Sequence, residues 1–137
     1  MADNFSQHLD NEQLGSLSSL ALAHVGDAVF ELMVRSWLAG GGKATSGSLH
    51  KDTVGIVNAK SPADFVKLIE PHLSEDELSV YKRGRNTHVN SVPKHMSIAD
   101  YHAATGFEAL FGWLWLKGCK ERLNELFEII TSKIIED

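Results

Sequence analysis

Apolar residues recur every three or four positions along most of the chain, which is the spacing of helices. No stretch alternates apolar and polar residues between turn signals, as a strand does. The pattern predicts an all-α protein with a first helix at about 12–38 and a second at about 48–59. Four more helices are predicted to begin after residues 61, 74, 97 and 118.

Capping signals support these boundaries. Ser61 precedes Pro62, which fits the first position of a helix. Ser74 and Glu77 have the spacing of a capping box, and Ser97 is a further N-cap. Loops are therefore predicted at 39–47 and 85–96.

One side of the first predicted helix is charged. His24, Asp27, Glu31 and Arg35 are spaced three or four residues apart, so their side chains share that side. Two interpretations stay open. The residues form either a solvated face with an ion pair or a group of carboxylates that binds a ligand.

Glu108 stands in the middle of a helix that is apolar in nearly every direction, which is typical of a buried helix. Its neighbours on the same side are the small residues Ala104, Thr105 and Gly112. A carboxylate in such a place is costly unless its pKa rises or a cation offsets its charge. Glu108 is therefore either half of an ion pair with a distant residue such as Arg35 or, with Asp27, part of a metal site.

Mg²⁺ suits a site of this kind, because it needs only one or two carboxylates together with waters and phosphate oxygens. Zinc is less suitable, since the histidines lack paired ligand spacing and Cys119 is the only cysteine. The sequence also lacks the G-x-S-x-G motif of serine hydrolases and a Walker-type phosphate loop.

The 137 residues are expected to form one domain, 1–137, in a reducing, cytoplasmic setting. No signal peptide is visible, and the apolar run 109–116 is too short to cross a membrane. The net charge of −5 is unevenly distributed, because 78–99 contains no acidic residue. That segment carries Lys82, Arg83, Arg85 and Lys94, so it is either a phosphate-binding surface or a solvated loop.

Several segments resemble one known family. "GDAVFE" (26–31) resembles the signature helix of ribonuclease III, and "FEALFGWLWL" (107–116) resembles its second acidic helix. "LHKDTVGIVNAKSPADF", "YKRGRN" and the "PKH" loop resemble the matching segments of Mini-ribonuclease III, the compact branch without a double-stranded-RNA-binding domain. The resemblance extends from about residue 14 to 134.

This resemblance implies a homodimeric, Mg²⁺-dependent ribonuclease III-type domain that cleaves double-stranded RNA to leave 5′-phosphate and 3′-hydroxyl ends. The Mini branch is associated with maturation of the large-subunit ribosomal RNA precursor, and a ribosomal protein that presents the substrate stays open. Asp27 and Glu108 match the catalytic and metal-binding acids of the family, with Glu31 as a water-mediated helper. Two further acids of full-length ribonucleases III are replaced by Ala23 and Thr105, which puts a second tightly bound metal in doubt.

The acid-free segment is then expected to bind RNA. Lys82, Arg83, Arg85 and Lys94 would contact phosphates, and Asn86 a sugar hydroxyl. The segment 17–25 is predicted as a dimer contact.

Two alternatives belong to other classes of protein. One is a catalytically silent ribonuclease III-like module that binds structured RNA or a ribosomal partner. The other is a helical scaffold, which explains the Trp-rich helix but not the acid-free segment.

Overall fold

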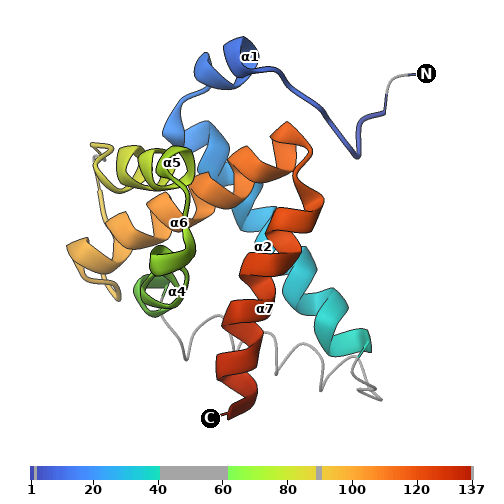
Figure 1. Cartoon of the computed structure of the whole chain (residues 1–137). Coiled ribbons are helices and arrows are strands. Elements are labelled where there is room, and N and C mark those ends of the chain that lie inside the picture. The colour runs from blue at the N-terminus through green and yellow to red at the C-terminus, as the bar shows by residue number, and fades with distance from the viewer. Residues whose placement is uncertain (2, 41–61, 89–90, 137) are drawn as a thin grey trace.

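The computed structural model describes residues 1, 3–40, 62–88 and 91–136, and within these ranges the chain forms helices and no strand (Figure 1). The predicted all-α class is therefore confirmed. The helices are α1 (Asn11–Gly15), α2 (Ser19–Gly40), α4 (Pro62–Ile69), the 3₁₀ turn η1 (Glu70–His72), α5 (Glu75–Arg85), α6 (Ile98–Lys117) and α7 (Lys120–Glu136). None of the described helices has the length and apolar character needed to cross a membrane.

The predicted single helix at 12–38 is wrong, because the chain forms α1 and then a separate α2. The backbone N–H of Ser16 bonds back to α1 and ends that helix. The Ser18 hydroxyl then accepts the N–H of Ala21 at 3.1 Å, which is the N-cap interaction that starts a new helix. A serine pair at 18–19 was therefore a helix start that apolar periodicity alone did not reveal.

The other described helix starts follow the predicted caps. Ser74 accepts the Glu77 N–H at 3.2 Å, while Glu77 accepts the Ser74 N–H at 2.8 Å. Ser97 accepts an N–H of the first turn of α6, and Gly118 ends that helix at a φ of 88°, which favours glycine. The predicted helix at 48–59 and its neighbouring cap Ser61 lie outside the described residues.

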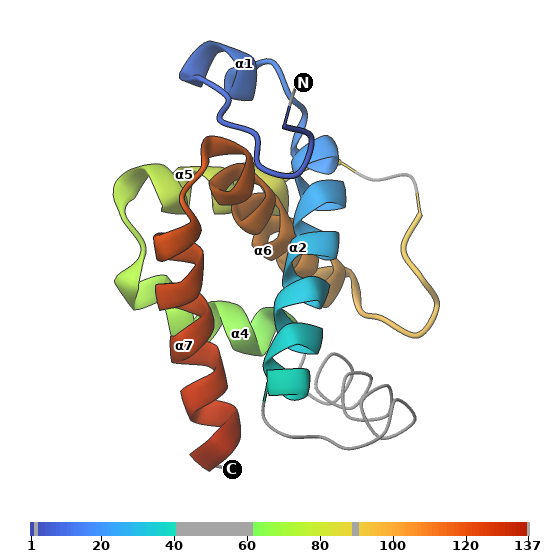
Figure 2. The ribbon, with the colours of Figure 1, turned by 90° about the vertical axis from the view of Figure 1, so that its right-hand side faces the viewer.

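Helix α6 lies at the centre of the fold and packs against α2, α4, α5 and α7 (Figures 1 and 2). Phenylalanine side chains fill the space between these helices. The Phe107 and Phe111 rings lie 4.6 Å apart, and the Phe30 ring contacts Phe107 at 5.1 Å and Phe65 at 5.5 Å. This cluster fixes α2 on α6, and those two helices carry the two unusual carboxylates.

Two glycines allow the backbones of α2 and α6 to touch. A Cβ atom on Gly26 would lie 1.7 Å from the carbonyl oxygen of Glu108. A Cβ atom on Gly112 would lie 1.9 Å from the carbonyl oxygen of Leu22. No other residue fits at either position without moving a helix, so the crossing point is set by glycine.

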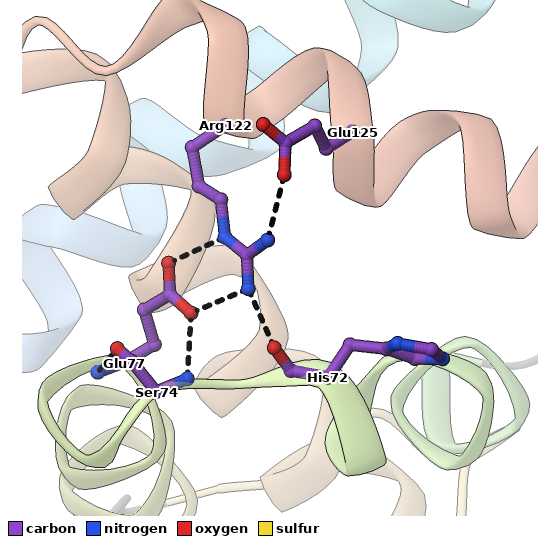
Figure 3. A network of polar contacts seen from close by, with 5 residues as sticks. All are labelled: His72, Ser74, Glu77, Arg122 and Glu125. Atoms are coloured by element: carbon purple, nitrogen blue, oxygen red, sulfur yellow. Dashed lines mark hydrogen bonds and ion pairs between the residues drawn. The ribbon is translucent and has the colours of Figure 1, made fainter.

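Arg122 on α7 fixes the beginning of α5 (Figure 3). Its guanidinium group binds both carboxylate oxygens of Glu77, at 2.8 and 2.9 Å, and also reaches the His72 carbonyl at 2.6 Å and Glu125 at 2.9 Å. Burial alone would raise the pKa of Glu77, but the hydrogen bonds from Arg122 and the Ser74 backbone hold it below its ordinary value. Glu77 therefore both caps α5 and joins it to α7.

Candidate active site

The α2–α6 crossing brings Asp27 and Glu108 together. Asp27 directly follows Gly26, whose Cα faces the backbone of Glu108. The Asp27 carboxyl group lies close enough to that of Glu108 to raise its pKa, although the two residues are 81 positions apart in the sequence. Asp27 is exposed and Glu108 is half-buried, so the pair stands at the surface end of a buried interface.

The environment disfavours a negative charge on Glu108. Burial and the neighbouring Asp27 carboxyl group raise the pKa of Glu108 from 4.5 to about 8. In the absence of a cation the folded protein therefore favours the protonated form of Glu108. A bound cation would offset both the burial and the repulsion.

No basic side chain offsets this charge within the part of the chain that the structure describes. Arg35, the distant partner considered from the sequence, instead binds Glu31 one turn away on α2. The ion-pair interpretation therefore holds for Glu31 and Arg35, and Arg35 is not the partner of Glu108. Glu31 remains a predicted water-mediated helper, now with its carboxylate engaged by Arg35.

The donor set fits Mg²⁺. Two carboxylates offer hard oxygen donors, and Mg²⁺ often takes no more than two from the protein. Across 3–40, 62–88 and 91–136 there is no cluster of three or more His, Cys, Asp or Glu side chains that could enclose a metal. A closed zinc site therefore does not fit the described residues, while an open Mg²⁺ site does.

The two positions where the acids of longer relatives are replaced provide no extra ligand. Ala23 is buried against Leu22 and Val80. Thr105 is 5% exposed, and its hydroxyl donates to the Tyr101 carbonyl at 3.0 Å. Both side chains pack within the chain and supply no metal ligand, which is consistent with a metal site built on two carboxylates.

Helix α5 places its basic end on the same part of α6. A Cβ atom on Gly84 would lie 2.8 Å from the Cα of Gly106 and 3.2 Å from the Thr105 carbonyl oxygen. Thr105 is one turn before Glu108. The C-terminal turn of α5 therefore crosses α6 about one helical turn from the carboxylate pair.

The predicted RNA-binding residues differ in their surroundings. Lys82 and Arg83 are exposed, and so is Lys94 in the segment between α5 and α6. Arg85 lies over the Tyr81 ring at 5.6 Å and donates to the Asn86 side chain at 3.3 Å. The described contacts join none of the five to Asp27 or Glu108, so their role in binding stays a prediction.

The glycines at the helix crossings were the main omission of the sequence reasoning. Gly112 was noted as a small neighbour of Glu108, but Gly26, Gly84 and Gly106 were not singled out. A signal was available, because glycine inside a helix is costly and is usually kept for close packing. Arg122 had no comparable signal, since its partner Glu77 comes from a helix 45 residues earlier.

Residues 20–118 match the family model described as the Ribonuclease III domain, so the helical fold is that of a ribonuclease III-type domain. The chain is 38% identical to Mini-ribonuclease 3 of Clostridium tetani (strain Massachusetts / E88) over 92% of this chain and 84% of that protein. It is 43% identical to Mini-ribonuclease 3 of Thermoanaerobacter sp. (strain X514) over 94% of this chain and 90% of that protein. The chain therefore belongs to the Mini-ribonuclease 3 family of endoribonucleases.

A solved structure has a similar fold. A Fusobacterium nucleatum protein of known crystal structure matches the fold with a TM-score of 0.77 and 29% sequence identity. The match covers 87% of this chain and 91% of that one. The similarity thus extends over nearly the whole length of both chains.

Proposed function

We propose that this chain is a Mg²⁺-dependent endoribonuclease that cleaves double-stranded RNA at the Asp27–Glu108 pair. The observation that carries the proposal is the contact between these two carboxyl groups, with no basic partner among the described residues. A catalytically silent module would gain nothing from two neighbouring acids that lower its stability. The family assignment supplies the class of reaction, and the acid pair is where we place it.

Asp27 and Glu108 would hold the ion. Mg²⁺ bound there would neutralise charge on the phosphate and favour ionisation of a bound water. Hydrolysis adds water to phosphorus and breaks the bond to the 3′ oxygen, which leaves a 5′-phosphate and a 3′-hydroxyl. Glu108 must first release its proton to become a ligand, and its pKa of about 8 makes that step depend on pH.

The basic end of α5 would orient the duplex. Lys82 and Arg83 are exposed for phosphate contacts, and the Tyr81 ring holds the neighbouring Arg85 in place. A-form RNA presents phosphates and 2′-hydroxyls across its shallow minor groove, which suits recognition of shape over sequence. Asn86 and Lys94 would extend this surface.

We place the chain in the cytoplasm, as a homodimer that matures the large-subunit ribosomal RNA precursor. A two-fold dimer would offer one carboxylate pair to each strand of a duplex. The predicted contact segment 17–25 is only partly available for such an interface. Leu22 and Ala23 are buried within the chain, whereas Leu20 is 46% exposed.

A direct assay tests this proposal. The purified protein is incubated with an end-labelled RNA duplex, with Mg²⁺ or with EDTA, and with the separated strands as a control. We expect cleavage of the duplex only with Mg²⁺, with 5′-phosphate product ends. Cleavage in EDTA, or a preference for the single strands, would refute it.

A further inference from the structure

A pocket of about 530 Å³ lies between α2 and α7, on a part of α2 that the proposed active site does not use. Leu32 and Ser36 line it from α2, and they are turned roughly 140–180° around that helix from Asp27. The volume is within the range of small-molecule sites in proteins. The pocket is therefore a separate feature that needs its own explanation.

Aromatic side chains form much of its wall. Trp37, Trp115 and Phe127 line the pocket together with Phe5 of the N-terminal segment. Phe5 is 65% exposed, and its ring meets the Trp115 ring edge-on at 5.4 Å. Such walls offer flat faces on which a planar ring can stack.

The N-terminal segment contributes Phe5 to the wall of the pocket. In Figure 2 this segment lies over the α6–α7 corner beside α2, and the Leu9 N–H binds the Leu116 carbonyl at 2.8 Å. The Lys120 ammonium group donates to the Ser6 hydroxyl at 2.8 Å and sits 5.5 Å from the Trp115 ring. An ammonium group has three N–H bonds, so Lys120 is held in place with donors to spare.

The charges of the lining point to an anion. Lys120 is its charged residue, Ser36 and Asn124 are its polar neutral ones, and it contains no carboxylate. The Asp3 carboxylate interacts electrostatically with Lys120 from the N-terminal segment without lining the pocket. Two acids of α7 adjoin lining residues in the sequence, Glu121 after Lys120 and Glu125 after Asn124, and neither belongs to the lining. Arg122 binds Glu125.

We propose that this pocket binds a nucleotide, with the base against the aromatic side chains and the phosphate at Lys120. Ser36 and Asn124 are available to hydrogen-bond the edge of the base. The nucleotide is either free in solution or an unpaired residue of an RNA strand, since both present the same ring and phosphate. The inference does not depend on the Asp27–Glu108 site.

The test uses tryptophan fluorescence of the full chain in EDTA, because Trp37 and Trp115 line the pocket. The probes are 5′-AMP, adenosine, a short single-stranded oligoadenylate and a blunt RNA duplex. The variants are Lys120→Gln and, as a matched control, Lys117→Gln, whose ammonium lies 4.4 Å over the Trp113 ring outside the pocket. Circular dichroism checks the fold of both.

We expect saturable quenching by 5′-AMP that is about tenfold weaker in Lys120→Gln and unchanged in Lys117→Gln, because a charged hydrogen bond to phosphate is lost. Adenosine, which lacks the phosphate, should bind both variants equally. If only 5′-AMP binds, the ligand of the pocket is a free nucleotide. If only the oligoadenylate binds, the ligand is an unpaired residue of an RNA strand.

Lys120→Gln also removes the hydrogen bond to Ser6 in the N-terminal segment, so a second variant is needed that leaves this segment intact. Ser36→Leu narrows the pocket and should weaken every nucleotide probe without touching that segment. Three results would overturn the proposal: no saturable quenching by 5′-AMP or oligoadenylate, equal binding by Lys120→Gln and wild type, or a change in light-scattering mass in Ser36→Leu. The last would mean that a second copy of the chain covers the pocket.

Discussion

Replacing Glu108 by glutamine keeps the shape of the side chain and removes its proton equilibrium. In the metal-free protein burial and Asp27 raise the pKa of Glu108 to about 8, against an ordinary 4.5. The folded state therefore holds this proton more tightly than the unfolded chain does. The protein should be most stable below about pH 4.5 with respect to this group, and stability should fall as pH rises toward 8.

The magnitude follows from the same values. Each pKa unit is worth about 1.4 kcal/mol, so the difference between 4.5 and about 8 sets an upper limit of about 5 kcal/mol. Partial exposure of Glu108 and local relaxation should reduce the loss between pH 5 and pH 9 to about 1–3 kcal/mol. Glu108→Gln should remove that loss, so the variant should be more stable than wild type above pH 7.

Urea unfolding at pH 5, 7 and 9 in EDTA measures this effect, with Glu12→Gln on exposed α1 as the control. Addition of Mg²⁺ should stabilise wild type and leave Glu108→Gln unchanged. Destabilisation of Glu108→Gln by about 3 kcal/mol or more at both pH 5 and pH 7 would contradict this prediction. That result would mean that Glu108 is half of a buried ion pair.

Three further changes probe the scaffold and the RNA surface. Gly26→Ala should lower the unfolding free energy by about 3 kcal/mol or more, because the new Cβ atom would meet the Glu108 carbonyl. The control Gly15→Ala has open space around it and should be neutral or slightly stabilising. Equal effects of the two substitutions would contradict the close backbone contact between α2 and α6. Glu77→Gln should cost about 2–3 kcal/mol at pH 7 in urea unfolding, and this cost should shrink progressively as pH falls below 4.5, because the pKa of Glu77 is lowered in the folded state. Arg85→Ala should weaken binding to all RNA duplexes, measured with Ca²⁺ in place of Mg²⁺ to prevent cleavage, and should reduce the slope of affinity against salt concentration by about one charge. An unchanged slope, or an equal change in the control Lys67→Ala, would exclude a phosphate contact by Arg85.

Local patterns were enough to predict much of the fold. Capping residues at Ser74 and Ser97 and the terminating Gly118 act within a few positions of themselves, so their effect is visible in the sequence. The break between α1 and α2 was missed because the apolar spacing continues across Ser18, where the second helix starts. Apolar periodicity indicates which residues are buried, but it does not show whether they belong to one continuous helix.

The candidate site was predictable in part. A carboxylate inside an apolar helix and another on a charged helix face are each anomalous, so Asp27 and Glu108 could be paired as a candidate metal site before the family resemblance matched the same two residues. Their contact depends on the α2–α6 crossing, where Gly26 and Gly112 must meet. Contacts between helices distant in sequence, such as Arg122 with Glu77, have no local signature and required the structure.

The central claim is that Asp27 and Glu108 hold the catalytic Mg²⁺, and single-turnover cleavage of a labelled RNA duplex by Asp27→Asn and Glu108→Gln tests it most directly. Each substitution keeps size and shape but weakens a ligand for a hard cation. We expect both variants to fold and to bind the duplex, and to show no cleavage at any Mg²⁺ concentration. Cleavage by either variant at the wild-type rate would contradict the account.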